Sequence, residues 1–170
     1  MAAQIGAPAA AARAHEELYS YWASLRRGSK LPARADIQPG AFKRLLPTVS
    51  LIDVEKGGSR GESRGEDLDF RLRLAGTGLY SVYGREITGR RLCDVYNSSA
   101  ADYWRYELGR VVSERRPTAG VHNLAWRGAS HLSILWMRLP LASNGSDVDM
   151  IMGYDAVVGV GQAHSGIRAA

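Results

Sequence analysis

The chain has a single cysteine, Cys93, among its 170 residues. This scarcity excludes an internal disulfide framework and a zinc site built from cysteines. Phenylalanine is also rare, with two residues against four tryptophans and eight tyrosines, so most large rings carry a polar atom that needs a partner when buried. No apolar run approaches the roughly 18 residues that a membrane helix requires. These absences favour a soluble, cytoplasmic protein.

Lysine is scarce as well, because 19 of the 22 basic residues are arginine. The net charge is +5 and the isoelectric point about 9.6, which by itself admits an anionic partner. However, the 17 acidic residues are mixed with the basic ones along most of the chain. The basic clusters are short and are more typical of helix ends and solvated loops than of a nucleic-acid surface. Nucleic acid is therefore disfavoured as a partner.

The length and the 45% content of hydrophobic residues fit one domain of common size. We expect this single domain to span residues 15–160, between a disordered tail of residues 1–14 and a second tail of residues 161–170. The first tail consists almost wholly of small, uncharged residues. It lacks the apolar core of a secretory signal.

A helix is predicted over residues 15–27, where large apolar residues recur at helical spacing and Gly28 follows as an end signal. The stripe and the rings beside it are Leu18, Tyr19, Tyr21, Trp22 and Leu25. This is more apolar surface than a short terminal helix usually leaves in water. We therefore expect these residues to form the interface of a homodimer. The alternative is a helix that folds back over its own sheet.

Strict alternation of apolar and charged residues over residues 68–74 predicts a half-buried strand. Residues 48–54 favour a second strand. Between them, residues 57–66 contain Ser-Arg-Gly-Glu twice in tandem, and such a polar, glycine-rich repeat predicts a flexible loop. Because one face of the strand is polar, the sheet should be antiparallel with one face in contact with water.

A longer helix is predicted from Ser98 or Ser99 to Arg116, with Pro117 as its stop. The last third then returns to β-favouring residues, with strands expected over residues 118–126, 131–141 and 149–158. The sum is an α+β fold: a five-stranded antiparallel sheet with short helices on one face, plus the N-terminal helix.

Several segments resemble a PAS domain, specifically a bacterial stand-alone group that begins with a Leu-x-x-Tyr-Trp helix. The resemblance spans about residues 17–158, and its most specific block runs from Arg-Leu-Ala-Gly-Thr at residues 73–77 to Gly-Arg-Glu-Ile-Thr-Gly at residues 84–89. It implies the PAS fold, in which the sheet cups short helices over a small central pocket. It also implies a sensing or protein-interaction role and frequent dimerisation through an N-terminal helix.

Aromatic side chains are expected to converge between the sheet and the helices. The candidates for a ligand pocket are Tyr80, Tyr83, Trp104, His122, Trp126 and Trp136. Of these, Trp126 is expected on the same strand face as His122. Rings that carry a few polar tips are the usual lining of a small-molecule site. The other interpretation is a core that the same rings simply fill.

No cofactor is indicated by the residues. Light-sensing flavin PAS domains carry a cysteine near the position of Cys93, but here it is displaced by one residue and the flanking motif is missing, which favours a buried structural thiol. Haem-binding PAS domains generally place their histidine on a helix, whereas His122 falls in a predicted strand. Haem and flavin are therefore both disfavoured. His122 and His131 lack further ligands at metal-binding offsets, so no metal site is predicted.

Catalysis is not indicated either. There is no nucleophile motif and no carboxylate pair at a spacing that suits acid–base chemistry. Gly76-Thr77-Gly78 matches only part of the dinucleotide fingerprint, because Ser81 stands where the third glycine is required. We expect a non-catalytic sensory or interaction module that signals to a partner protein in trans, with a small-molecule ligand in its pocket. The alternatives are a ligand-free adaptor that acts through dimerisation and a small-molecule enzyme.

Overall fold

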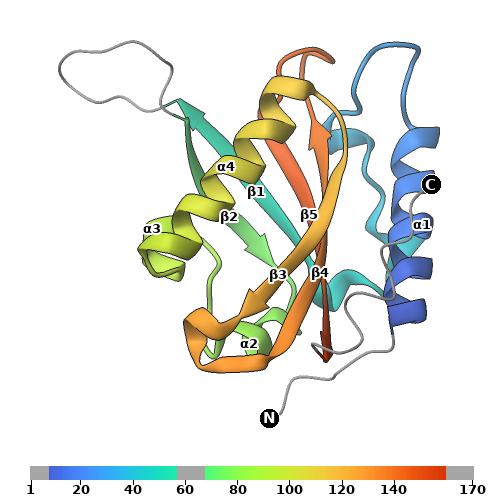
Figure 1. Cartoon of the computed structure of the whole chain (residues 1–170). Coiled ribbons are helices and arrows are strands. Elements are labelled where there is room, and N and C mark those ends of the chain that lie inside the picture. Colours follow the sequence, from blue (N-terminus) through green and yellow to red (C-terminus); the bar gives the residue numbers. More distant parts are fainter. Residues whose placement is uncertain (1–7, 57–67, 160–170) are drawn as a thin grey trace, which may run out of the picture.

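The computed structural model describes residues 8–56 and 68–159, which form a twisted sheet with helices on both faces (Figure 1). The strands are β1 (Val49–Lys56), β2 (Leu68–Ala75), β3 (Thr118–Leu124), β4 (Ala129–Leu141) and β5 (Met150–Gly159). The α-helices are α1 (Pro8–Ser24), α2 (Leu79–Tyr83), α3 (Leu92–Val95) and α4 (Ser98–Glu114). Single 3-10 turns are η1 (Arg34–Asp36), η2 (Pro39–Phe42), η3 (Leu46–Thr48) and η4 (Ala125–Arg127).

The sheet order is β2-β1-β5-β4-β3, and every neighbouring pair is antiparallel. This confirms the predicted α+β class and the five-stranded antiparallel sheet. Helices α2, α3 and α4 lie on one face, and α1 lies on the other (Figure 1). We call these the helix side and the α1 side. The sheet is thus covered from both faces over β4 and β5.

Helix α1 begins at Pro8, so the expected tail of residues 1–14 is wrong for residues 8–14. The alanines that made this stretch look featureless have the highest helix propensity, and Pro8 suits a first helical position. Ala11 and Ala14 are buried and extend the apolar stripe of the helix toward its start. Residues 1–7, the repeat of residues 57–66 and residues 161–170 lie outside the described residues.

The α1 stripe packs on the sheet of its own chain. Leu18 and Trp22 are almost fully buried, and Trp22 Nε1 donates a 2.8 Å hydrogen bond to the carbonyl oxygen of Pro140 in β4. They therefore have no surface for a second copy, and their assignment to a dimer interface is wrong. The helix folds back because burying a tryptophan in the same chain needs no second molecule.

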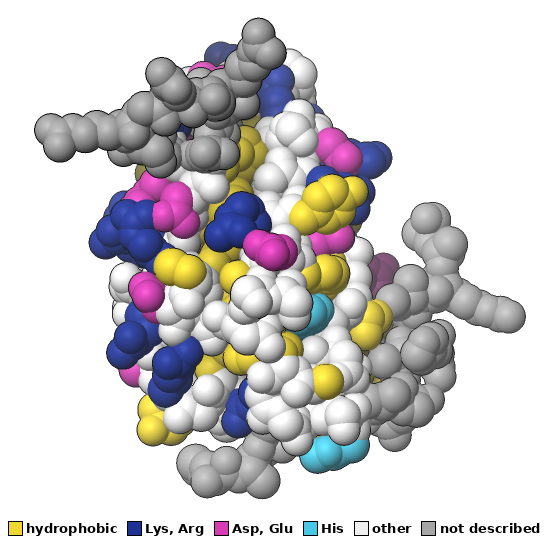
Figure 2. Space-filling view, turned by 60° about the vertical axis from the view of Figure 1, so that its left-hand side comes forward, with side chains coloured by type: hydrophobic (Ala, Val, Ile, Leu, Met, Phe, Trp, Pro, Cys, Tyr) yellow, Lys and Arg dark blue, Asp and Glu magenta, His cyan; other side chains and the backbone are white. Residues whose placement is uncertain are grey.

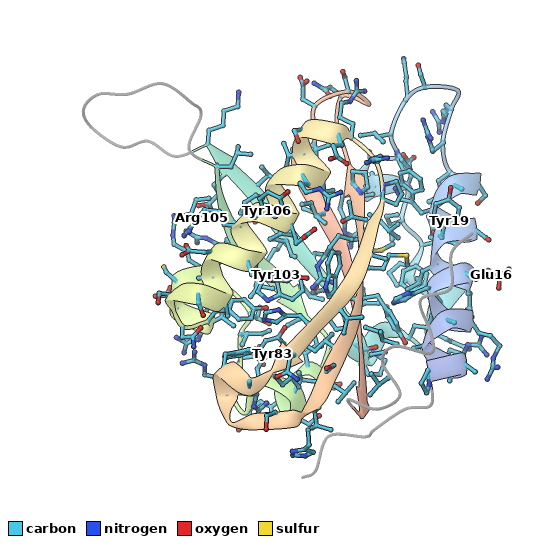
Figure 3. The ribbon with its side chains drawn as sticks, viewed as in Figure 1. Glu16, Tyr19, Tyr83, Tyr103, Arg105 and Tyr106 are labelled. Carbon is cyan, nitrogen blue, oxygen red and sulfur yellow. The ribbon has the colours of Figure 1, made fainter. Side chains whose placement is uncertain are left out.

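The other three proposed interface residues are less buried. Tyr21 and Leu25 are partly buried against the same core. Tyr19 alone is about half exposed, on α1 at the surface of the molecule (Figure 3). Homodimer formation stays a prediction, and it would now have to use Tyr19 rather than the buried stripe.

A β-bulge interrupts the alternation predicted for β2. Leu72 lies opposite Ile52 and Leu74 lies opposite Leu51, so Arg73 is an extra residue that has no opposite residue in the β1 register. The extra residue turns Leu74 to the α1 side, whereas Leu72 stays buried on the helix side. Leu74 is left 47% exposed, and it does not share a face with Leu72 as the alternation predicted.

Helix α4 supplies most of the cover on the helix side. Asn97 caps its start, because the side-chain oxygen accepts a 3.0 Å hydrogen bond from the backbone N–H of Ala100. Arg115 ends the helix in a left-handed conformation, with φ of 53°. Between these ends, Trp104 and Leu108 are among the largest fully buried side chains. Within the described residues, no helix is long and apolar enough to cross a membrane.

Two buried or partly buried histidines, His15 and His122, allow a prediction of how the stability of the fold depends on pH. His15 on α1 packs edge-on against Tyr154, with ring centroids 5.5 Å apart, and burial lowers its pKa. Burial also lowers the pKa of His122. The folded state then binds fewer protons than the unfolded chain near the ordinary pKa of histidine, so stability should fall as pH drops through about 6.5. We expect thermal unfolding to show a melting temperature several degrees lower at pH 5.5 than at about pH 7.5.

The double variant His15→Gln/His122→Gln should lose most of this pH dependence. His131→Gln is the matched control, because His131 is exposed and its replacement should leave the dependence intact. Equal pH dependence in the double variant and the parent would contradict the assignment.

Candidate functional site

The helix side of the sheet contains a very small cavity. Its volume is about 10 Å³, which is the space of one water molecule. Its walls come from the sheet and from α2, α3 and α4, and its polar lining comprises Ser50, Tyr83, Tyr96, Trp104, Arg138 and Asp155. Side chains therefore fill the centre of the fold, and what remains is a space of the size of one water molecule with both polar and apolar walls.

A buried ion pair dominates this cavity. Arg138 in β4 donates from Nη2 to Asp155 Oδ1 in β5 at 2.8 Å, and each side chain is only 3% exposed. The second guanidinium nitrogen, Nη1, donates to the carbonyl oxygens of Met137 and Tyr154. Burial raises the pKa of Asp155, because the charged form is costly away from water. The pair is thus well hydrogen-bonded, but burying it is expensive.

The register of the hairpin makes room for the guanidinium. Arg138 lies opposite Gly153, and Asp155 lies opposite Trp136, so the two charges are diagonal neighbours on one face. A Cβ on Gly153 would come 2.5 Å from Ser50 Oγ and 3.1 Å from Arg138 Nη1. Gly153 is therefore the residue that lets the arginine lie flat across the sheet.

Aromatic rings enclose the pair from the helix side. The Arg138 guanidinium carbon lies 4.6 Å from the ring centroid of Trp104 and 5.6 Å from that of Trp136. Such cation–π contacts gain strength when the cation is desolvated. Tyr83 from α2 and Tyr96, which follows α3, share a 2.9 Å hydrogen bond between their hydroxyl groups. Burial raises the pKa of both tyrosines, so both stay neutral.

Two donors on the cavity wall have no partner among the described residues. Arg138 Nε and Trp104 Nε1 are both buried and make no hydrogen bond there. Unpaired buried donors cost roughly 1–3 kcal/mol each. Both residues line the same cavity, whose volume matches one hydrogen-bond acceptor of the size of water.

The six proposed pocket residues separate into three groups. Tyr83 and Trp104 line the cavity. Trp126, Trp136 and His122 form a layer around it, with Trp126 5.0 Å from the ring of Tyr96 and His122 stacked 4.2 Å from that of Tyr103. Tyr80 is exposed and points away from the core. Tyr83 and Tyr103 lie on the side of the sheet opposite Tyr19 (Figure 3).

The expected placement of Trp126 in a strand is wrong. It lies in the turn η4, because a shift in register after Asn123 ends β3 at Leu124. Gly128 then takes a positive φ of 80°, which closes the turn. Trp126 consequently reaches Tyr83 and Tyr96 from the end of the hairpin rather than from the sheet face.

Sequence reasoning missed the central pair and Tyr96. A signal was present, since Arg138 is the one charged residue in residues 132–141 and Asp155 is the one charged residue in residues 150–158, within neighbouring predicted strands. Two opposite charges placed in this way indicate a buried pair once the hairpin register is known. Tyr96 was missed because it follows a glycine-rich segment whose short helices show no clear hydrophobic periodicity.

The residues present do not fit haem or flavin in the cavity. A volume of about 10 Å³ is far below the 300–1,000 Å³ typical of cofactor sites. Cys93 is exposed on α3, so the interpretation as a buried thiol is wrong and its sulfur does not face the cavity. His122 stands outside the cavity and stacks on Tyr103. In the described residues, no group of three or more His, Cys, Asp or Glu side chains could hold a metal ion.

The surface charges are mixed. Figure 2 shows basic and acidic side chains next to one another on the face that carries α3 and α4. Several are direct pairs, such as Arg105 with Asp102 and Arg110 with Glu107. Such a face lacks the one-sign potential that favours nucleic acid.

Comparison with solved structures finds light-oxygen-voltage (LOV) proteins. An RsLOV variant is 16% identical, with a TM-score of 0.46, over 69% of this chain and 64% of that one. The LOV protein of Rhodobacter sphaeroides is 13% identical, with a TM-score of 0.47, over 73% and 70%. An RNA-binding LOV receptor is 15% identical, with a TM-score of 0.45, over 79% and 37%. The chain thus spans less than two thirds of the first and last of these structures.

No curated protein matches the chain. A family model does: the model described as PAS domain, PAS_5, matches residues 10–155. The match covers most of the chain, including β1 to β4, the first part of β5 and all residues that line the cavity. PAS domains are typically sensory or signalling modules. The chain belongs to the PAS domain family.

Proposed function

We propose that the chain is a non-catalytic signalling module of the cytoplasm that uses no prosthetic group in its helix-side cavity and acts on a partner protein in trans. The observation that carries the proposal is the filled centre of the fold. In place of a cofactor, the aromatic rings of Trp104 and Trp136 and the pair Arg138–Asp155 occupy the space under the helices.

A core filled in this way favours output through the surface. Without a bound chromophore, a change of state has to come from contact with another protein or from a shift of the short helices α2 and α3. These helices have five and four residues, too few to be stable outside tertiary packing. Homodimerisation belongs to the same proposal, with Tyr19 as the exposed candidate on α1.

A second candidate function is supported by the unpaired donors. Arg138 Nε and Trp104 Nε1 would both be satisfied by one small acceptor in the cavity. In that case the chain would sense a molecule of about the size of water that competes with water for these donors. The cavity as described accommodates nothing larger.

Absorbance and native mass spectrometry of the freshly purified full chain test the proposal. We expect no absorbance beyond the tryptophan band and a mass equal to that of the polypeptide. A haem or flavin band would overturn it. A small adduct that is retained by the parent and lost in Trp104→Phe, which keeps a ring but removes the donor, would select the second candidate function.

The ion pair should be replaceable as a unit. Arg138→Met leaves the buried Asp155 carboxylate without its partner, and we expect it to lower the free energy of unfolding by about 3–5 kcal/mol. Adding Asp155→Leu removes the orphaned charge, and the double variant should recover most of the loss. Urea unfolding monitored by tryptophan fluorescence measures all three proteins.

The matched control is the exposed pair Arg73–Asp53, which is joined at 2.7 Å with Arg73 60% exposed. Arg73→Met should leave the urea midpoint of unfolding almost unchanged, because surface pairs are screened by solvent. A double core variant that is no more stable than Arg138→Met would show that the pair itself holds the fold together.

A further inference from the structure

A larger pocket lies on the α1 side of the sheet, away from the cavity described above. Its volume is about 480 Å³, which falls within the range of small-molecule sites. Its floor is the outer face of β1 and β2, where Val49, Leu51 and Leu74 lie. Its wall is the segment with η1, η2 and η3, which joins α1 to β1 on that side of the sheet (Figure 1).

Two close contacts hold this wall in place. Tyr21 of α1 packs against Phe42 with ring centroids 5.2 Å apart, and its hydroxyl oxygen accepts a hydrogen bond from the backbone N–H of Gln38. At the other end, a Cβ on Gly76 would come 2.1 Å from the carbonyl oxygen of Leu46, so η3 lies directly against the end of β2. The pocket is therefore built into the fold.

Apolar surface dominates the interior of the pocket. Leu74 is one of the few large hydrophobic side chains that remain exposed, and the bulge in β2 is what turns it toward this space. Exposed apolar side chains gathered in a concave site indicate a binding function more strongly than the same residues scattered singly.

The charges at this pocket are of one sign and unpaired. Arg34 and Lys43 are the only charged residues among the described residues that line it, and both are exposed. Neither side chain has a hydrogen bond or ion pair in the described part of the chain, whereas the nearby Arg44 is paired with Glu17. Arg27, on the same connecting segment, also has a partner, in Asp36. The pocket is thus lined by two cations that have no partner among the described residues.

We propose that this outer pocket binds a free medium-chain carboxylate. The hydrocarbon chain lies on Leu51 and Leu74, and the carboxylate is held by Arg34 and Lys43. The volume of about 480 Å³ lies within the range of small-molecule sites and admits a ligand of the size of decanoate. This site is separate from the helix-side cavity, and the proposal holds whether or not that cavity takes a ligand.

Isothermal titration of the full chain tests the site with two probes of equal chain length. Decanoate should bind, and decanol should bind more weakly because it lacks the charge. Arg34→Gln/Lys43→Gln should weaken decanoate binding by about tenfold or more, since hydrogen bonds to a charged group are lost, and should leave decanol within about twofold. Leu74→Trp should abolish the binding of both probes by filling the pocket.

The matched control is Arg27→Gln/Arg44→Gln, which removes the same formal charge from cations that do not line the pocket, and it should change decanoate binding by less than about twofold. Thr77→Trp is a second blocking variant on an exposed lining residue, for use where Leu74→Trp does not fold. The proposal is overturned if decanoate does not bind, or if Arg34→Gln/Lys43→Gln and the control double variant weaken decanoate binding equally. It is also overturned if Leu74→Trp abolishes self-association of the chain rather than carboxylate binding.

Discussion

One buried charge pair sets the conditions for the helix side of this fold. Arg138 and Asp155 form an ion pair between β4 and β5, where both side chains are buried. A guanidinium in such a place needs space, hydrogen-bond acceptors for its N–H groups and a covering side chain that tolerates its charge. Gly153 leaves the space, and the carbonyl oxygens of Met137 and Tyr154 accept hydrogen bonds from the guanidinium. The ring of Trp104 covers the guanidinium from the helix side. Within the described residues the central cavity is small for this reason, because the rings that enclose the arginine fill the space.

The two faces of the sheet consequently differ in chemistry. The helix side is closed, aromatic and polar at one point, with a cavity of about 10 Å³. The α1 side is partly open, because α1 covers β4 and β5 but leaves the outer face of β1 and β2 to the connecting segment of residues 25–48. A single extra residue, Arg73, determines which face each neighbouring leucine occupies. Leu72 stays on the helix side, and Leu74 lies on the α1 side. The usual location of a PAS ligand is therefore occupied, and free space lies on the opposite face.

The sequence predicted the fold well where periodicity is strong and poorly where it is weak. Alternation through Phe70 and Leu72, the helix stripe around Trp104 and the Asn-Gly turn before β5 were enough for the class and the sheet. The start of α1 was missed because alanines carry little hydrophobic signal, although Ala11 and Ala14 are buried. Sequence alone also does not distinguish an apolar helix stripe that meets a partner from one that meets its own sheet, which is why Leu18 and Trp22 were assigned to a dimer.

The candidate sites were less predictable, because both depend on register. Whether Arg138 faces Asp155 depends on how β4 and β5 pair, and the diagonal contact exists only with Trp136 opposite Asp155. Likewise, Leu74 faces the outer pocket because β2 has an extra residue, Arg73, opposite the step from Leu51 to Ile52, and no local sequence pattern shows this bulge. Of the aromatic candidates, Tyr83 and Trp104 line the cavity, and the rings there enclose an ion pair rather than an open pocket.

The most direct test of the closed helix-side core is the electron density of a high-resolution crystal structure of the freshly purified chain. The account predicts an intact Arg138–Asp155 pair and one peak of the size of water within hydrogen-bond distance of Arg138 Nε and Trp104 Nε1. Continuous density for a larger group between α4 and the sheet, with Tyr83 and Tyr96 moved apart to admit it, would contradict the account.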